Sequence, residues 1–497
     1  MRIVASALAA VNSSAPTPRA AGFARGFAWA CALFTAGPCA AANPQTLPPQ
    51  VLAALQQAGV PADAMSVAVH DAHSGRAVLE WQAREPRNPA SLVKLLTTFA
   101  ALDRLGPAWS WATPVWLTGP LQAGVLEGSM FIKGSGDPRL VMERVWLLLR
   151  RVQQLGVREI RGDIVLDSSA FAVPDAPPGD FDGEPLRPYN VRPAALLLNY
   201  RSVAYTFTPD LAAGSARVVA DPPLAGVQVD RSVALSTGPC EQWRASLKAE
   251  FEATRTRFAG NYPAACGEQT WPVADPQPAS YDARLIAALW RELGGQLQGS
   301  VRDGTAPLDL KPAFELRSPP LAEVVRDINK FSNNLMSQQL FLTLAREAAP
   351  REPATPEAAR DTLTRWLVER TGAATSVDDF VLDNGSGLSR STRLSAARLA
   401  RLLLRAWDSP VMSELMSSLP ISGLDGTLRR SRTTPGRAHL KTGSLRDVAA
   451  VAGYALSQNG RRYVVVAIIN HAQANAARPA LDALVQWALR DAPRYAP

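Results

Sequence analysis

The sequence predicts an α+β fold in which one antiparallel sheet, flanked by helices, is built from both ends of the chain. Each end contains two alternating apolar segments joined by a tight turn and accompanied by a helical segment. Between about residues 106 and 311 the pattern changes to short strand-like runs separated by Gly, Pro and Asp. We therefore expect one domain made from 43–105 and 312–497, interrupted by one or two β-rich accessory domains over 106–311.

The terminal elements follow from their residue spacing. Near the N-terminus the spacing predicts a helix over 50–58 and strands at Met65–Asp71 and Ala77–Trp81. Near the C-terminus it predicts strands at Asp447–Leu456 and Tyr463–Asn470, joined at Asn459-Gly460, which suits a type I′ turn. The apolar positions after residue 480 recur at helical spacing, so the chain is expected to end in an amphipathic helix.

Two helices are predicted directly after the insertion. Apolar residues recur at helical spacing from Leu321 to Ile328 and again from Met336 to Leu344, with a break at 330–334. The second helix should stop near Pro350. Because a break between helices exposes its residues, residues 330–334 are candidates for a functional site.

Composition excludes several classes of protein. The chain has 497 residues, 47% of them hydrophobic and 19% charged, which excludes a disordered chain. Four His and four Cys are too few for a multi-metal centre, and we expect no metal and no cofactor. The net charge of +8 is not clustered, so nucleic acid is not an expected partner. Only six of the 52 basic residues are lysines, and a buried lysine, unlike arginine, can act as a base.

Residues 1–42 are typical of a secretory signal peptide. They contain three arginines and no acid, followed by the apolar run Gly26–Gly37 and the small residues 39–42. We expect cleavage near Ala40–Ala42 and export to the periplasm. No second apolar span of about 18 residues follows, so at most peripheral membrane association is expected.

Cleavage would remove Cys31 and Cys39 and leave Cys240 and Cys266. In an oxidising compartment one disulfide is the economical interpretation, and a loop of about 26 residues would stabilise the fold by roughly 3 kcal/mol. Two separate buried thiols are the alternative.

Ser91 and Lys94 are the first candidates for chemistry. They form an S-x-x-K motif at the start of a predicted helix, where unpaired backbone N–H groups favour developing negative charge. Lys94 lies one turn on, on the same side. A lysine held neutral by burial and cationic neighbours can take the proton of a serine hydroxyl and make it a nucleophile.

Two further motifs follow in order. Ser332-Asn333-Asn334 occupies the break between the predicted helices, where a hydroxyl can relay a proton and an amide can hold a substrate carbonyl. Lys441-Thr442-Gly443 precedes a predicted strand, where Gly443 lets a substrate backbone lie close and Thr442 can bind a carboxylate. The order S-x-x-K, S-x-N, K-T-G is the signature of penicillin-binding proteins and serine β-lactamases.

Beyond these motifs the chain resembles the class C low-molecular-mass penicillin-binding proteins, the D-alanyl-D-alanine carboxypeptidase/endopeptidase family. The resemblance runs through nearly the whole mature chain and rests on these segments: Gly134–Pro138, Gly162–Asp167, Leu198–Tyr200, Ile328–Asn334, Asp383–Arg390, Leu424–Leu428 and Lys441–Leu445. It implies the penicillin-binding/serine β-lactamase-like transpeptidase fold.

The resemblance also implies a reaction. Ser91 would attack the carbonyl between two D-alanines of a peptidoglycan stem peptide, with Lys94 as base and Ser332 relaying the proton to the leaving amine. The roles implied for the other residues are the backbone N–H groups of Ser91 and Ser444 as oxyanion hole, Thr442 and Ser444 for the terminal carboxylate, Asn334 for the substrate amide, and Lys330 and Lys441 to depress the pKa of Lys94. β-Lactams would acylate the same serine.

Two other functions stay open at this point. One is a β-lactamase or esterase of the same fold, which the lack of an E-x-x-x-N sequence between Asn334 and Lys441 disfavours. The other is a non-catalytic peptidoglycan-binding sensor that penicillin acylates. The intact set of motifs argues against a dead enzyme.

Overall fold

A computed structural model of the chain describes residues 46–307, 309–372 and 380–490. The predicted signal peptide, with Cys31 and Cys39, lies outside the described residues. Within the described ranges, no helix is both long enough and apolar enough to cross a membrane.

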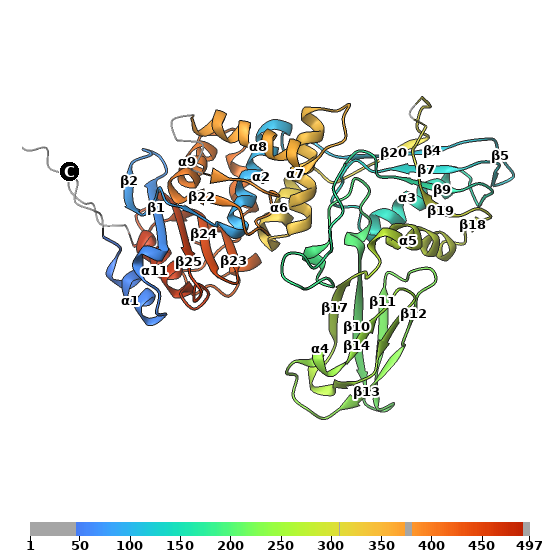
Figure 1. Cartoon of the computed structure of the whole chain (residues 1–497), viewed down its shortest axis with the longest axis horizontal. Coiled ribbons are helices and arrows are strands. Elements are labelled where there is room, and N and C mark those ends of the chain that lie inside the picture. Colours follow the sequence, from blue (N-terminus) through green and yellow to red (C-terminus); the bar gives the residue numbers. More distant parts are fainter. Residues whose placement is uncertain (1–45, 308, 373–379, 491–497) are drawn as a thin grey trace, which may run out of the picture. The chain divides into compact units, whose positions relative to one another are not determined.

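The central sheet unites the two ends of the chain, as predicted. Its strand order is β2-β1-β25-β24-β23, and every neighbouring pair is antiparallel. In Figure 1 the blue N-terminal strands lie beside the red C-terminal ones. The strands are β1 (Met65–Asp71), β2 (Ala77–Trp81), β23 (Ala438–Leu445), β24 (Val448–Leu456) and β25 (Arg462–Asn470). The predicted strand positions are confirmed to within a residue.

Helices cover both faces of this sheet. Val465 and Ala467 of β25 belong to a core shared with α1 and α11, whereas Val464 and Val466 belong to a core shared with the other helices. Burial on both faces explains why β25 is almost continuously apolar. The helices are α1 (Pro49–Gln57) and α11 (Arg478–Leu489) on one side, and α2 (Lys94–Leu105), α6 (Leu321–Phe331), α7 (Asn334–Ala348), α8 (Pro356–Thr371), α9 (Ala396–Trp407) and α10 (Met412–Ser418) on the other.

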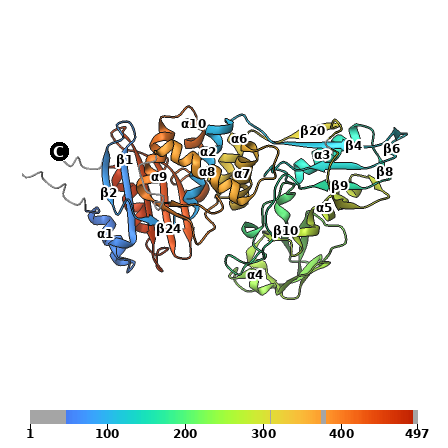
Figure 2. The ribbon, with the colours of Figure 1, turned by 45° about the horizontal axis from the view of Figure 1, so that its top comes forward.

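The inserted region contains more helix than its sequence pattern predicts. Alongside short strands it holds α3 (Met142–Gln154) and α5 (Pro278–Glu292), whose apolar stripes pack into a core of their own with the strands (Figure 2). The other α-helix and strands of the described residues are α4 (Trp243–Ser246), β3 (Pro86–Arg87), β4 (Ala112–Leu117), β5 (Leu121–Gln122), β6 (Val125–Leu126), β7 (Met130–Lys133), β8 (Glu159–Ile160), β9 (Ile164–Asp167), β10 (Ser202–Asp210), β11 (Ser215–Asp221), β12 (Gln228–Val229), β13 (Ser232–Ser236), β14 (Ala249–Phe251), β15 (Arg255–Phe258), β16 (Asn261–Pro263), β17 (Gln269–Ala274), β18 (Gln296–Leu297), β19 (Val301–Asp303), β20 (Phe314–Arg317), β21 (Phe380–Val381) and β22 (Arg393–Ser395). The predicted disulfide joins Cys240 and Cys266 in this region.

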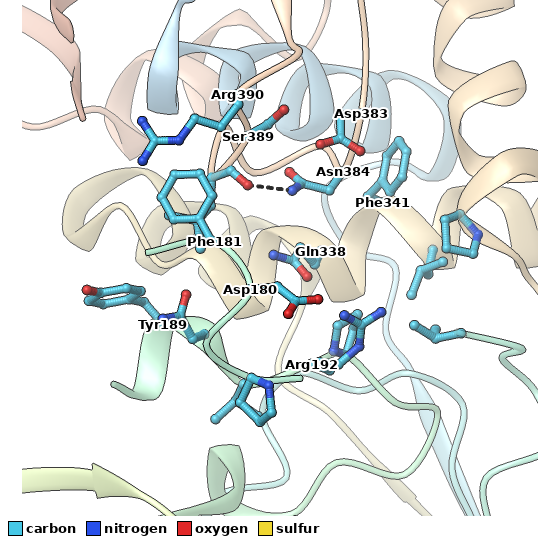
Figure 3. Close-up of a pocket in the computed structure, with 18 of the residues that line it drawn as sticks. Asp180, Phe181, Tyr189, Arg192, Gln338, Phe341, Asp383, Asn384, Ser389 and Arg390 are labelled. Carbon is cyan, nitrogen blue, oxygen red and sulfur yellow. Dashed lines mark hydrogen bonds between the residues drawn. The ribbon is translucent and has the colours of Figure 1, made fainter. Parts of the chain in front are cut away.

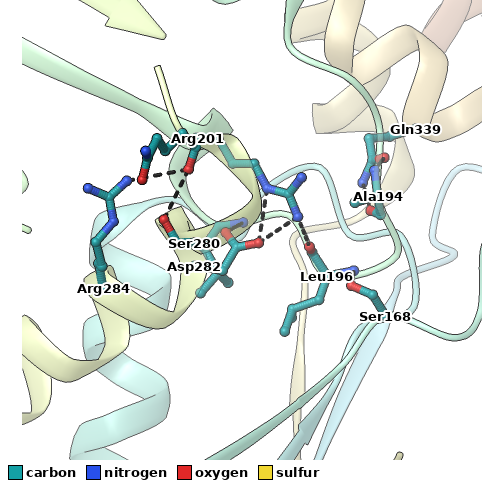
Figure 4. A network of polar contacts seen from close by, with 10 residues as sticks. Ser168, Ala194, Leu196, Arg201, Ser280, Asp282, Arg284 and Gln339 are labelled. Carbon is teal, nitrogen blue, oxygen red and sulfur yellow. Dashed lines mark hydrogen bonds and ion pairs between the residues drawn. The ribbon is translucent and has the colours of Figure 1, made fainter. Parts of the chain in front are cut away.

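Polar contacts attach the inserted region to α7. The buried Gln339 side chain donates to Gly136 O and Ala194 O and accepts from Ala194 N, at 3.2, 2.9 and 3.0 Å. Ala194 lies in the same segment as Leu196, which accepts from Arg201 (Figure 4). Because α7 begins at Asn334, this attachment lies little more than one turn from the S-x-N motif.

Candidate active site

Ser91 lies in a tight turn directly before α2. The sequence predicted that Ser91 opens an α-helix, but Ala90–Val93 form a 3-10 turn instead, and Ala90 has a positive φ of 46°. The Asn88 side chain accepts from the Ala90 N–H at 2.9 Å and donates to Ser389 O at the same distance. The turn is therefore shaped by tertiary contacts and not by helix propensity.

Gly387 packs against this turn. It has a φ of +83°, and a Cβ added to it would lie 2.0 Å from Ala90 O. Only glycine permits both the backbone conformation and the close approach. The loop that contains Gly387 thus holds the backbone of the serine turn from behind.

Lys94 is fully buried beside Ser91. Its Nζ lies 3.0 Å from Ser91 Oγ and 2.6 Å from Asn334 Oδ1, and it also contacts Ser386 O. Burial lowers the pKa of Lys94 well below its usual value, and the charge of Lys441 lowers this pKa further. The structure therefore favours a neutral amine at this position.

A neutral amine here points its lone pair at Ser91. It has two N–H groups, and the two oxygens of Asn334 and Ser386 can only accept, so they take both donors. The Ser91 hydroxyl is the remaining partner and donates to the nitrogen. This is the geometry of a base poised to receive the serine proton.

A second serine–lysine pair lies on the other side of the site. Lys441 Nζ donates to Ser332 Oγ at 2.8 Å and to Thr442 O at 2.7 Å. Burial lowers the pKa of Lys441 to about 7. Lys441 can therefore give or take a proton near neutral pH, through Ser332.

The free edge of the central sheet forms part of the candidate active site. β23 is an edge strand, and the N–H of Leu440 donates to Pro420 O on the side away from β24. Alternate N–H groups of a strand point the same way, so the N–H of Ser444 also faces this edge. A Cβ on Gly443 would lie 2.6 Å from Pro89 O, so glycine is what lets the edge approach the serine turn.

Lys330 does not have the position that its predicted role requires. Its Nζ lies 2.6 Å from Asp425 Oδ2, and this ion pair offsets its charge. The two causes that lower the pKa of Lys94 are burial and Lys441, and Lys330 is not among them. Lys330 instead ties the end of α6 to the loop containing Asp425.

A cavity of about 530 Å³ brings the predicted residues together. Ser91, Ser332, Thr442, Gly443 and Ser444 all line it. Asn334 reaches the site through Lys94, and Lys441 reaches it through Ser332.

Sequence reasoning missed three participants. Ser386 O and Thr427, which accepts from Thr442 at 2.8 Å, lie in segments that the resemblance marked without assigning them a role. Arg478, which lines the cavity and donates to Ser444 Oγ at 2.8 Å, carries no signal in the sequence beyond its place at the start of a helix.

A second cavity, of about 460 Å³, is shared by the inserted region and the loop 383–391. Figure 3 shows it with Arg390 and Asn384 from that loop, Gln338 from α7, and Phe181 and Arg192 from the inserted region. Arg390 stacks over the Phe181 ring at 4.9 Å, and Asn384 donates to Leu388 O at 2.8 Å. The loop that holds Lys94 therefore also joins the two parts of the chain.

The fold and the two serine–lysine pairs define the class of protein: an enzyme with the site geometry of serine acyl transfer. A model of the D-Ala-D-Ala carboxypeptidase 3 (S13) family matches residues 47–491, and the chain belongs to this family. The predictions of the family and of a serine-type D-Ala-D-Ala carboxypeptidase are confirmed.

Individual relatives agree with this assignment. The D-alanyl-D-alanine carboxypeptidase of Actinomadura sp. (strain R39) is 27% identical over 433 residues, which cover 82% of this chain and 77% of that protein. Penicillin-binding protein 4 of Haemophilus influenzae has a similar structure, with a TM-score of 0.71, 22% identity, and coverage of 88% of this chain and 99% of that one. A penicillin G-acylated predatory endopeptidase of Bdellovibrio bacteriovorus also shares the fold, with a TM-score of 0.51, 15% identity, and coverage of 85% and 91%. The predicted α+β fold is thereby confirmed.

Proposed function

We propose that this chain hydrolyses the D-Ala-D-Ala bond of peptidoglycan stem peptides through an acyl-enzyme on Ser91. The observation that carries the proposal is the buried Lys94 amine, which lies 3.0 Å from Ser91 Oγ and within hydrogen-bond distance of Asn334 Oδ1 and Ser386 O. In the neutral amine these two oxygens accept both N–H groups, so the lone pair faces the serine hydroxyl. A serine without such a base is a poor nucleophile.

The first step is attack by Ser91 Oγ on the carbonyl of the penultimate D-alanine. The hydroxyl proton moves to Lys94 Nζ as the C–O bond forms, and the N–H groups of Ser91 and Ser444 hold the oxyanion. The proton then reaches the leaving nitrogen by way of Ser332, which Lys441 orients at 2.8 Å. The C–N bond breaks, D-alanine leaves, and water hydrolyses the ester.

The same site suits a peptide cross-link. In a cross-link the scissile bond is again an amide of D-alanine, and where the third stem residue is diaminopimelate the leaving amine also belongs to a carbon that carries a carboxylate. Arg430 and Asp482 also line the cavity, and its volume of about 530 Å³ is large enough for a leaving group longer than alanine. We therefore include endopeptidase activity in the proposal.

We propose that the protein acts in the periplasm, where its peptidoglycan substrate is found. The signal peptide predicted over 1–42 would export it there. β-Lactams are expected to acylate Ser91. The Bdellovibrio relative of the same fold is described as acylated by penicillin G, and a structure of the Haemophilus relative is described as a complex with a β-lactam.

The test is release of D-alanine from a synthetic stem pentapeptide, run beside cleavage of a cross-linked muropeptide dimer. Ser91→Ala is compared with Ser417→Ala, which removes an exposed hydroxyl on α10. We expect the wild type and Ser417→Ala to release D-alanine and Ser91→Ala to release none. Activity in Ser91→Ala, or none in the wild type, would overturn the proposal.

A further inference from the structure

Arg478 lines the cavity of the candidate active site beside Ser444, one of the two residues to which the resemblance assigns the terminal carboxylate of the substrate. It is the first residue of α11, and it lines the same cavity as Ser91, Thr442 and Ser444. Its Nη2 donates to Ser444 Oγ at 2.8 Å. Thr442 and Ser444 point to the same side of β23, because side chains alternate along a strand.

The Arg478 guanidinium is held in place by Asn475, whose side chain is bonded to the backbone at the end of β23. Asn475 Nδ2 donates to Leu445 O at 2.8 Å and to Arg446 O at 3.0 Å, while its Oδ1 accepts from Arg478 at 3.0 Å. The amide thus fixes the guanidinium relative to the end of β23. Preorganisation of this kind reduces the entropy lost when an anion binds.

The charge of Arg478 is available to a ligand. Among the described residues, no carboxylate forms an ion pair with Arg478. Asp482, one turn along α11, is too far away for an ion pair, although the charge of Arg478 acts to lower its pKa. The Arg478 guanidinium and the Ser444 hydroxyl lie side by side, with Thr442 on the same side of β23, and a guanidinium beside hydroxyl groups is a set of donors that suits a carboxylate.

We infer that Arg478 is the residue that selects substrates with a carboxylate on the carbon next to the scissile nitrogen, and that Asn475 positions it. The inference rests on the proposed function and deepens it, because it assigns the charge that recognises the leaving group. The same group is present in terminal D-alanine and in a stem peptide cross-linked through diaminopimelate, so Arg478 would serve both reactions on such a substrate.

The test compares a peptide ending in D-Ala-D-Ala with the same peptide ending in D-alaninamide. The enzyme is used as wild type, Arg478→Gln, Arg478→Lys and Arg446→Gln. Arg446 is exposed in the β23–β24 turn and does not line the cavity, so its variant removes an equal charge from nearby. The measured quantity is the ratio of kcat/KM for the free acid to kcat/KM for the amide.

Loss of one charge-assisted contact should lower this ratio roughly 10- to 100-fold in Arg478→Gln, mainly by raising KM for the acid. Arg478→Lys should restore part of the ratio and Arg446→Gln should leave it within about twofold. Asn475→Ala should act like a weaker Arg478→Gln. A ratio in Arg478→Gln equal to that of the wild type would overturn the inference.

A second measurement, the intact mass of the protein after incubation with benzylpenicillin, shows whether the role of Arg478 or the proposed function itself is wrong. If Arg478→Gln still forms a penicilloyl adduct and keeps the wild-type ratio, only the role of Arg478 is wrong. If the wild type itself neither acylates nor releases D-alanine, the proposed function is wrong.

Discussion

Replacing Asn334 by Asp should move the pH dependence of acylation upward, because it places a carboxylate beside the proposed base. The Asn334 Oδ1 atom lies 2.6 Å from Lys94 Nζ. At an effective dielectric constant of about 20, a unit negative charge at that distance favours the ammonium form by about 6 kcal/mol. Even half of that energy raises the pKa of Lys94 by about two units. Acylation needs the neutral amine, so the pH at which its rate reaches half of the maximum should rise by about two units relative to the wild type.

The assay is the second-order rate constant for labelling by a fluorescent penicillin between pH 6 and pH 10. Asn333→Asp is the matched control, because it adds the same charge in the same motif while Asp still caps α7 through the Met336 N–H. Asn334→Leu removes the acceptor without adding charge and should lower the rate without moving the profile upward. If the Asn334→Asp profile superimposes on that of Asn333→Asp, the neutral amine of Lys94 is not the base.

Two other predictions follow from the packing around the site. Gly387→Ala should slow acylation by about a hundredfold or more, because its Cβ would lie 2.0 Å from Ala90 O and displace the serine turn. The control is Gly75→Ala, which has a similar φ of +70° and no atom within 4 Å of the added Cβ, and which should acylate at the wild-type rate. Equal acylation rates for the two variants would contradict this prediction. Lys441→Met should abolish turnover yet raise the melting temperature near pH 7. The unfolded state binds the Lys441 proton up to about pH 10.5 and the folded state only to about 7, so the stability of the wild type rises with pH over that range. The difference in melting temperature should therefore shrink towards pH 10, and a difference independent of pH would contradict the assignment.

The central sheet was predictable because its strands carry local signals. β1 and β25 are far apart in the sequence but pair in the sheet. The alternating pattern of β1 and the continuous apolar run of β25 each indicate a buried strand, and Asn459-Gly460 indicates the turn between β24 and β25. The three motifs were predictable for a related reason. Each requires particular residue types within four positions, so a single sequence displays it.

Features set by contacts between distant segments were not predictable. The Lys330–Asp425 ion pair joins residues 95 positions apart, and no local pattern distinguishes a paired lysine from a free one. The 3-10 turn at Ser91 depends on Gly387 and on the bond from Asn88 to Ser389 O, and these distant contacts override the helix propensity of the segment. The helices of the inserted region are a different case, because α3 carries Val145, Leu148, Leu149 and Val152 at helical spacing, a signal that the strand-like runs around it obscured.

The most direct test of the account is the intact mass of the mature protein, followed over time with benzylpenicillin and completed by peptide mapping of the labelled site. The account predicts a single penicilloyl adduct on Ser91, absent from Ser91→Ala and lost slowly. Rapid loss with consumption of penicillin would indicate a β-lactamase. No adduct, or an adduct at another residue, would contradict an acyl-enzyme on Ser91.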